Sequence, residues 1–244
     1  LPQMTVDVEL KETNIIQERD EIISFISDVC GINDRTEINI NSTIPVGRGL
    51  GSSAALSIAI ARAKKLTNVR EIADKCEKFI HGNPSGIDVN QVLSDTPLLF
   101  SKKDGAIPLN FNLDSYLLII DTGVIGITKE TLKHIKQNFE NYKSYIDELG
   151  EITEKVIEPL KKKAIEIVGA YMYKAHDLLQ KLGVSHESND DVVNICKNNG
   201  ALGAKLTGGG AGGCCIALSK TKENAEKIQN ELAKKGYKSW IVTV

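Results

Sequence analysis

The residues with the types and spacing needed for chemistry begin with a glycine-rich segment at residues 45–55, PVGRGLGSSAA. Gly47, Gly49 and Gly51 occupy every second position, so the backbone can adopt positive φ angles and no side chain covers its N–H groups. Serines and a run of helix formers follow through residue 63, which predicts a helix that begins directly after the turn, with serine as its cap. The positive end of such a helix and its free N–H groups favour an anion, and phosphate is the best candidate.

The hydroxyls of Ser52 and Ser53 could serve two purposes at this turn. They could bond phosphate oxygens directly, or they could ligate Mg²⁺ as the Ser/Thr of other nucleotide sites does. A capped helix after a tight turn is the alternative when the segment is considered alone. The segment is not a P-loop, since no Gly-Lys-Ser/Thr follows at the required spacing, and it is not the dinucleotide fingerprint either.

Two carboxylates, Glu77 and Asp88, follow further along the chain. Glu77 lies at the border of the apolar face of a predicted helix, where a carboxylate is either solvated or directed at a cation. His81 comes one turn later on the same flank. The sequence HGNPSGID then ends the helix and delivers Asp88 from a loop rich in proline and glycine. Considered alone, this loop is also typical of a surface turn.

A second glycine cluster, KLTGGGAGGC, occupies residues 205–214. Gly208, Gly210 and Gly213 formally match the dinucleotide fingerprint, but that fingerprint must open a helix. Residues 214–218 have the pattern of a strand instead, so we interpret the match as accidental.

The composition limits the partners of the protein. The 244 residues include 41% hydrophobic and 25% charged residues, which is ordinary for a globular protein with a sizeable core. The net charge of -2 argues against a surface for nucleic acid or membranes, so a small-molecule substrate is expected. Since no apolar run approaches the ~20 residues of a membrane span and no secretory signal opens the chain, we expect a cytoplasmic protein. A homodimer is compatible with the sequence.

The five cysteines and four histidines do not form a metal-binding pattern. The cysteines are odd in number and contain no CxxC pair, and two of them are adjacent within an apolar run at residues 214–215. This usage is typical of reduced, buried thiols, and the scattered histidines argue against zinc.

Periodicity predicts a mixture of helices and strands with no internal repeat. Asn68 and Glu71 stand at capping-box spacing before one of the helices. The predicted strands are residues 5–10, 37–42, 116–120, 214–218 and 237–244, with a hairpin at 98–107. The predicted helices are residues 21–29, 54–63, 69–80, 190–198 and 222–235, with long helical patterns at 128–181 that break near Gly150.

Three segments taken together resemble the kinase superfamily named after galactokinase, homoserine kinase, mevalonate kinase and phosphomevalonate kinase, the GHMP kinases. PVGRGLGSSAA and KLTGGGAGGC resemble its second and third signature motifs, and HGNPSGID resembles the PSGxD loop of mevalonate kinases. The DTGV at residues 121–124 and the SWI around Trp240 further resemble bacterial mevalonate kinases, so the resemblance covers most of the chain.

The resemblance implies an α+β fold of two domains. Residues 1–112 would form the ATP-binding domain, similar to a ribosomal-protein domain, and residues 113–244 a ferredoxin-like domain. The implied activity is the ATP-dependent phosphorylation of mevalonate to 5-phosphomevalonate in isoprenoid biosynthesis. Phosphomevalonate kinase is the nearest alternative, although no cluster of basic residues near HGNPSGID would hold a phosphorylated acceptor. Another small-molecule kinase of the superfamily and a non-catalytic ligand sensor on the same fold are the further alternatives.

The resemblance also assigns roles to individual residues. Asp88 would act on the substrate hydroxyl, and Ser53 and Glu77 would hold Mg²⁺. The ATP phosphates would be bound by Pro45, Gly47, Arg48, Gly49, Leu50, Gly51, Ser52, Ser53 and Ala54. The substrate would contact His81, Ser85, Asp88, Thr207, Gly208 and Gly209. The N-terminal motif of the superfamily, with its phosphate-neutralising lysine, has no counterpart in this sequence, and we expect residues to be missing from it.

Overall fold

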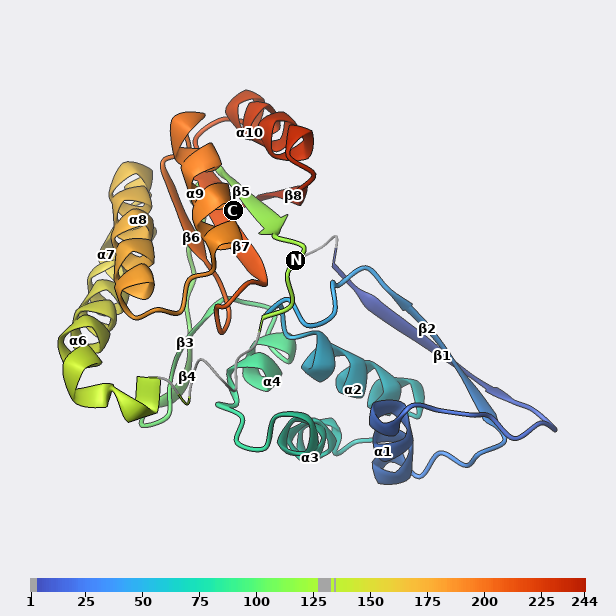
Figure 1. Cartoon of the computed structure of the whole chain (residues 1–244). Helices are drawn as coiled ribbons and strands as arrows, with labels where there is room; N and C mark the ends of the chain where they lie inside the picture. The colour runs from blue at the N-terminus through green and yellow to red at the C-terminus, as the bar shows by residue number, and fades with distance from the viewer. Residues whose placement is uncertain (1–3, 127–132, 134) are drawn as a thin grey trace. The chain divides into compact units, whose positions relative to one another are not determined.

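The computed structural model describes residues 4–126, 133 and 135–244, which form two compact units (Figure 1). The first unit comprises Leu1–Val46 and Gly51–Asn110, and the second comprises Gly47–Leu50 and Phe111–Val244. The predicted domain boundary between residues 112 and 113 lies close to the point where the chain passes from the first unit to the second, between Asn110 and Phe111. The boundary itself stays a prediction. It did not anticipate that four residues of the glycine-rich segment group with the C-terminal unit.

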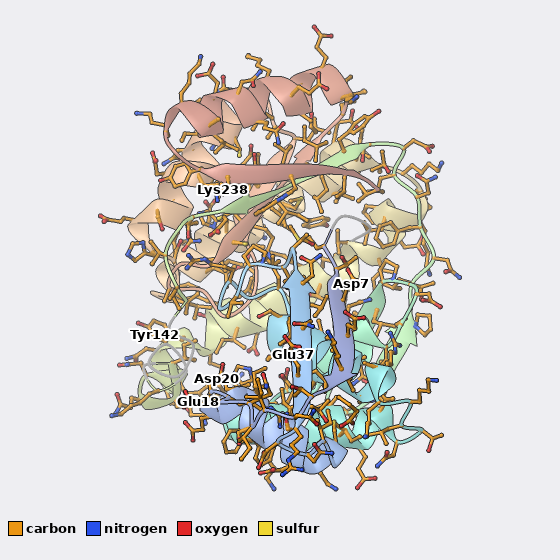
Figure 2. All side chains as sticks on the ribbon, turned by 90° about the vertical axis from the view of Figure 1, so that its right-hand side faces the viewer. Asp7, Glu18, Asp20, Glu37, Tyr142 and Lys238 are labelled. Atoms are coloured by element: carbon orange, nitrogen blue, oxygen red, sulfur yellow. The ribbon has the colours of Figure 1, made fainter. Side chains whose placement is uncertain are left out.

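The first unit is built on a two-stranded antiparallel sheet of β1 (Val6–Glu12) and β2 (Thr36–Ser42). Residues opposite each other share a face, so the polar residues of both strands gather on one side. Figure 2 looks onto this side, with Asp7 on β1 and Glu37 on β2. The other side carries the alternating apolar residues, which pack against a core that includes Ile26, Ile60 and Ile72.

The helices of the first unit supply that core. They are α1 (Glu21–Cys30), α2 (Ser52–Ala63), α3 (Val69–His81) and the short α4 (Ile87–Val92). The predicted hairpin follows as β3 (Leu98–Ser101) and β4 (Gly105–Pro108). All the predicted elements of this unit are therefore present, and α4 is an additional helix.

One predicted helix cap is wrong, and a second is right in position but not in its hydrogen bond. The cap of α2 is Gly51 at φ 66°, and no side chain caps the helix, so Ser52 lies inside its first turn. Glycine takes the cap position because this backbone is left-handed, a conformation that costs a serine energy. Asn68 is the N-cap of α3, as predicted, but its side chain makes no capping hydrogen bond to the helix backbone. The side chains of Asn68 and Glu71 contact each other instead of completing the predicted capping box.

The second unit contains a four-stranded antiparallel sheet in the order β6-β7-β5-β8. Its strands are β5 (Tyr116–Asp121), β6 (Gly203–Leu206), β7 (Cys214–Ser219) and β8 (Lys238–Thr243). The strand at β7 confirms that the second glycine cluster opens no helix. The cluster is instead the turn between β6 and β7.

Helices α8 (Ile165–Lys181), α9 (Glu187–Asn198) and α10 (Lys222–Lys234) pack against this sheet (Figure 1). The buried core between α9, α10 and the sheet includes Val192, Ile228, Leu118 and Ala217. Two further helices, α6 (Phe139–Lys155) and α7 (Ile157–Lys161), precede α8. All five cysteines are buried and free, as the sequence predicts.

The predicted break near Gly150 is wrong, because α6 runs through that residue. The chain instead departs from the helix at Val156 and again at Lys162, on either side of α7. The part of this prediction that concerns residues 128–132 and 134 lies outside the described residues. Within the described ranges, no helix combines the length with the apolar character that crossing a bilayer requires.

Glycines allow α8 to lie directly on the backbone of β6. A Cβ placed on Gly203 would lie 2.2 Å from the carbonyl oxygen of Gly169, so no larger residue fits at this crossing. His176 lies seven residues beyond Gly169 along α8, and Leu206 lies three residues beyond Gly203 along β6. Both paths are about 10 Å long, which brings His176 beside Leu206 at the end of the strand.

Candidate active site

One group of predicted site residues lies in the first unit, at the beginning of α2. Ala55 donates the first helical hydrogen bond, to the Gly51 carbonyl at 3.0 Å. The N–H groups of Ser52, Ser53 and Ala54 precede that bond and therefore have no acceptor within the helix. They point outward at the positive end of the helix dipole, which is an arrangement suited to phosphate oxygens.

Ser53, Glu77 and His81 come together beside this helix start. The Ser53 hydroxyl lies 3.2 Å from His81 Nε2, and Glu77 Oε2 lies 3.7 Å from the same nitrogen. Glu77 and His81 are one turn apart on α3 and so share a face of that helix. The structure therefore brings the two predicted Mg²⁺ ligands together, and it places His81 against them.

The predicted loop is present at residues 82–86, and Asp88 follows it in the first turn of α4, after the Gly86 cap. Its side chain is half-buried and adjoins Gly51, since a Cβ placed on Gly51 would lie 3.5 Å from the Asp88 carboxyl group. Asp88 is thus a second carboxylate of the first unit, and it lies next to the turn that starts α2.

Burial shifts the acidity of both carboxylates in the same direction. Burial raises the pKa of Glu77, and the Ser53 hydroxyl and the charge of His81 partly oppose this shift. Burial also raises the pKa of Asp88, again partly opposed by His81. The side chain of Glu77 is only 4% exposed, and its Oε1 atom is buried without a hydrogen-bond partner. An unpaired buried carboxylate oxygen is costly, so the position favours a cation.

The residues present fit a magnesium ion that is shared with phosphates. Mg²⁺ is usually held by one or two carboxylates together with substrate oxygens rather than by a cage of protein ligands. Glu77 and the Ser53 hydroxyl provide such a partial set. Among the described residues, no group of three or more His, Cys, Asp or Glu side chains could hold a metal ion without such help.

A further group of predicted site residues lies within the C-terminal unit, where Gly47–Leu50 packs against the turn between β6 and β7. The Arg48 carbonyl accepts a hydrogen bond from the Cys214 N–H at 3.1 Å. A Cβ placed on Gly208 would lie 2.8 Å from the Cα atom of Gly49, which is closer than real Cβ contacts. The two predicted glycine motifs therefore touch backbone to backbone, and glycine is needed at the contact.

The side chain of Arg48 holds this segment to the end of β5. Its Nε lies 3.0 Å from Asp121 Oδ1, and one of its terminal nitrogens donates to the Gly123 carbonyl at 3.0 Å. Asp121 also accepts from the Gly123 N–H at 2.9 Å. The guanidinium is thus engaged within its own unit, although its Nη1 atom has no hydrogen-bond partner.

The remaining predicted residues differ in how they could contact a ligand. Ala54 is fully buried, so only its backbone is available. Ser85 is exposed, and its hydroxyl accepts a hydrogen bond from the Ile87 N–H at 3.3 Å, which is the contact of a simple turn. Thr207 is half-buried and closes the β6–β7 turn through its N–H, which donates to the Cys214 carbonyl at 2.9 Å. Pro45 and Leu50 are half-buried, whereas Gly209 is exposed.

Three residues support these segments although the sequence assigned no role to them. Asp121 pairs with Arg48, and the Thr122 hydroxyl donates to the Gly213 carbonyl at 2.6 Å. Asn189 binds the backbone of Gly212. Residues 121–124 stood out only through the family resemblance, and an asparagine in the first turn of a helix carries no signal beyond that of a cap.

Comparison with known proteins decides the family. Two family models match the chain, the GHMP kinases N terminal domain at residues 14–94 and the GHMP kinases C terminal at residues 156–238. The mevalonate kinase of Thermococcus sibiricus is 32% identical over 233 residues, a match that covers 88% of this chain and 69% of that protein. The chain belongs to the GHMP kinase family. The mevalonate kinase of Pyrococcus furiosus is 30% identical, and the match covers 91% of this chain and 75% of that protein.

The fold agrees with this membership. The crystal structure of L. major mevalonate kinase in complex with R-mevalonate superimposes with a TM-score of 0.84, covering 98% of this chain and 86% of that one. At 24% identity this likeness concerns the fold alone. The predicted α+β, two-domain GHMP kinase fold is therefore confirmed. The two sequence relatives are archaeal, whereas the motifs resemble bacterial mevalonate kinases as well.

Proposed function

We propose that this GHMP kinase transfers the γ-phosphoryl group of ATP to mevalonate and forms 5-phosphomevalonate and ADP, a step of isoprenoid biosynthesis. The observation that carries the proposal is the 32% identity to the Thermococcus sibiricus mevalonate kinase over most of both chains. The geometry of each unit is compatible with phosphoryl transfer, which depends mainly on positioning and on neutralising charge.

The nucleotide phosphates would bind at the glycine-rich segment. The free N–H groups at the start of α2 support this assignment for Ser52, Ser53 and Ala54. The glycines at 47, 49 and 51, all of which have positive φ angles, would bring the backbone close to the phosphates. For Arg48 the contacts with Asp121 and Gly123 favour a supporting role, with its backbone nearer the nucleotide than its guanidinium.

Ser53 and Glu77 would hold Mg²⁺, which when bound neutralises negative charge on the phosphates. The unpartnered Oε1 atom of Glu77 supports this assignment. His81, whose ring nitrogen faces both side chains, would orient the Ser53 hydroxyl. This contact is an addition to the predicted role of His81 in the substrate pocket.

Asp88 would accept the proton of the mevalonate hydroxyl. The hydroxyl oxygen forms its bond to the γ-phosphorus as the bond from that phosphorus to the leaving ADP oxygen breaks, and the proton passes to the Asp88 carboxylate. The raised pKa of Asp88 supports this role, because a base works best when its pKa approaches the working pH. Alternatively, Asp88 would only orient the hydroxyl without taking its proton, since a loose transition state needs little help from a base. Ser85, Thr207, Gly208 and Gly209 would contact the substrate.

A coupled assay of ADP release tests the proposal on the full-length protein. Mevalonate, phosphomevalonate and homoserine are supplied in parallel, each with ATP and Mg²⁺. Turnover with mevalonate alone is the expected result. Preference for phosphomevalonate or homoserine would replace the substrate assignment, and ATP binding without turnover of any of the three would favour a ligand sensor. The cytoplasmic location and the homodimer stay predictions, and light scattering coupled to size-exclusion chromatography tests the second.

A further inference from the structure

The turn between β6 and β7 has an exposed tip and a buried base. Gly208 and Gly209 are exposed, whereas Gly210, Gly212 and Gly213 are buried. The proposed function assigns a role only to the tip. What holds the base determines where the N–H groups of the tip point, because a run of glycines has no intrinsic preference for one conformation.

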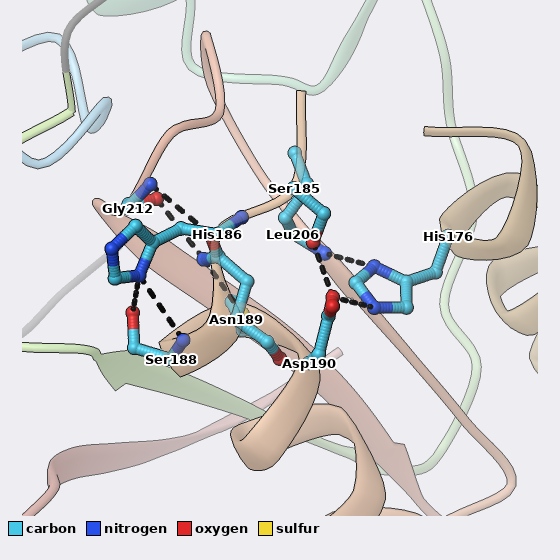
Figure 3. Close-up of polar contacts among 9 residues, drawn as sticks. His176, Ser185, His186, Ser188, Asn189, Asp190, Leu206 and Gly212 are labelled. Carbon is cyan, nitrogen blue, oxygen red and sulfur yellow. Dashed lines mark hydrogen bonds and ion pairs between the residues drawn. The ribbon is translucent and has the colours of Figure 1, made fainter. Parts of the chain in front are cut away.

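Asn189 lies in the first turn of α9, and its side-chain amide binds the base of the turn (Figure 3). Its Nδ2 donates to the Gly212 carbonyl at 3.0 Å, and its Oδ1 accepts from the Gly212 N–H at 3.1 Å. The same Oδ1 accepts from the His186 N–H at 3.1 Å, and Nδ2 lies 3.4 Å from Cys215 Sγ. Two donors and two acceptors are thus satisfied in a fully buried side chain, which leaves the amide one orientation.

The chain just before α9 holds the middle of the turn. The Val184 carbonyl accepts a hydrogen bond from the Ala211 N–H at 2.8 Å. A Cβ placed on Gly210 would lie 2.2 Å from the same carbonyl oxygen, so the two backbones are in direct contact. The segment from Val184 to Asn189 therefore follows the turn from its middle to its end.

The neighbouring residue Asp190 supports the other end of the turn, where β6 finishes. Its carboxylate accepts a hydrogen bond from the Ser185 hydroxyl and lies 3.3 Å from His176 Nε2 (Figure 3). His176 Nδ1 lies 3.4 Å from the backbone nitrogen of Leu206, two residues before Gly208. The start of α9 thus contacts both the beginning and the end of the turn.

We propose that Asn189 is a positioning residue for phosphoryl transfer, which fixes the base of the β6–β7 turn so that the Gly208 and Gly209 backbone is presented to the bound phosphates or substrate. Asn189 binds the base of the turn rather than its exposed tip, and it acts through Gly212. This inference rests on the proposed function for its kinetic consequence, but the contact with Gly212 stands independently of any substrate.

A purely structural role for Asn189 is the competing explanation, because its Oδ1 also completes the capping box of α9. Loss of a cap lowers stability and reduces the fraction of folded enzyme, which lowers kcat without changing KM. Displacement of the tip alters how the folded enzyme binds its substrates and transition state. KM therefore distinguishes the two explanations.

The test compares Asn189→Ala, Asn189→Asp and the control Asn194→Ala, which changes an exposed asparagine of the same helix. Kinetics are measured well below each melting temperature. We expect Asn189→Ala to lower kcat/KM about 10²-fold with a raised KM for ATP or mevalonate, the scale of a small misplacement of positioning groups. Asn189→Asp keeps the accepting oxygen but loses the donated bonds and places a buried carboxylate oxygen against the Gly212 carbonyl, so it should not recover the loss, and Asn194→Ala should match the wild type. An unchanged KM in folded Asn189→Ala enzyme would overturn the inference.

Amide hydrogen exchange, followed by NMR without substrate, separates this inference from the proposed function. In the wild type the Gly212 amide should exchange much more slowly than the Gly209 amide, because Asn189 accepts its hydrogen bond. The Ala variant should lose this protection, while the Asn194→Ala control keeps it. Equal exchange at Gly212 and Gly209 in the wild type would overturn the inference even if no variant folds. Normal protection combined with no turnover of mevalonate by the wild type would instead overturn the proposed function alone.

Discussion

Replacing Glu77 with glutamine should make the ligand-free protein more stable and its Mg²⁺–ATP complex less stable than the wild type. The carboxylate is almost fully buried, its Oε1 atom has no partner, and the negative charge of Asp88 adds to the effect of burial on its pKa. Glutamine keeps the shape of the side chain and removes the charge. The substitution therefore removes a cost that Ser53 and His81 offset only in part and that a bound cation would offset further.

The size of the effect follows from these contacts. An unsatisfied buried acceptor costs about 1–3 kcal/mol, and more when it is charged. Recovery of about 1 kcal/mol should raise the melting temperature by roughly 2–4 °C in a protein of this size. Ligand at a hundred times its dissociation constant stabilises the wild type by about 2.7 kcal/mol, and the glutamine variant should lose most of this gain because it lacks a metal ligand.

Thermal unfolding by circular dichroism measures both effects, with ATP alone, with Mg²⁺–ATP and without ligand. Glu71→Gln is the matched control, because Glu71 lies on the same helix and is exposed, and a glutamine can keep its side-chain contacts with Lys75 and Asn68, so its effect should stay within about 0.5 kcal/mol. A ligand-free Glu77→Gln protein that melts below the wild type would refute the reasoning from burial. Equal stabilisation of both proteins by Mg²⁺–ATP would refute the metal assignment.

The pH dependence gives a further check on Glu77. Because its pKa in the folded protein lies above the ordinary value of 4.5, the folded state binds a proton more tightly than the unfolded state. The charged Glu77 should therefore lower the free energy of unfolding more as the pH rises above 4.5, and less as the pH falls towards 4.5. The difference in melting temperature between Glu77→Gln and the wild type should narrow from pH 7 to pH 5.

Three further outcomes can be checked with the same assays. Asp88→Asn keeps the shape but removes the basicity, so kcat should fall by ~10²-fold or more with ATP binding little changed, and near-normal turnover would return this segment to a simple turn. Gly208→Ala should lower kcat/KM about 10²-fold because its Cβ would meet the Gly49 backbone, whereas Gly236→Ala, with a similar positive φ but open space, should cost only stability. Burial lowers the pKa of His176, so the unfolded state protonates first and stability should fall as the pH drops below about 6.5; His176→Gln should flatten this dependence in thermal unfolding, and an unchanged slope would contradict it.

The residues 184–190 show why sequence reasoning missed part of the site. Periodicity predicted a helix at residues 190–198, whereas α9 begins at Glu187 because His186 and Asn189 form a reciprocal cap. The partners of that asparagine, Gly212 and Cys215, lie more than twenty residues away along the chain. No local pattern encodes a contact of that kind.

The sequence by itself determined most of the strands and helices, the glycine turns and the identity of the carboxylates, whereas β6 was not predicted. These features depend on the alternation of neighbouring residues, on glycine's access to positive φ angles and on the breaking of helices by proline, which are local properties. Only the tertiary structure decided that Gly51 rather than a serine caps α2, that Glu77 is buried beside Ser53 and His81, and that Gly47–Leu50 pack against the β6–β7 turn. Burial and backbone contact depend on the packing of segments that are distant in the sequence. The free energy that holds these segments together comes from the whole hydrophobic core rather than from the few residues that form the site.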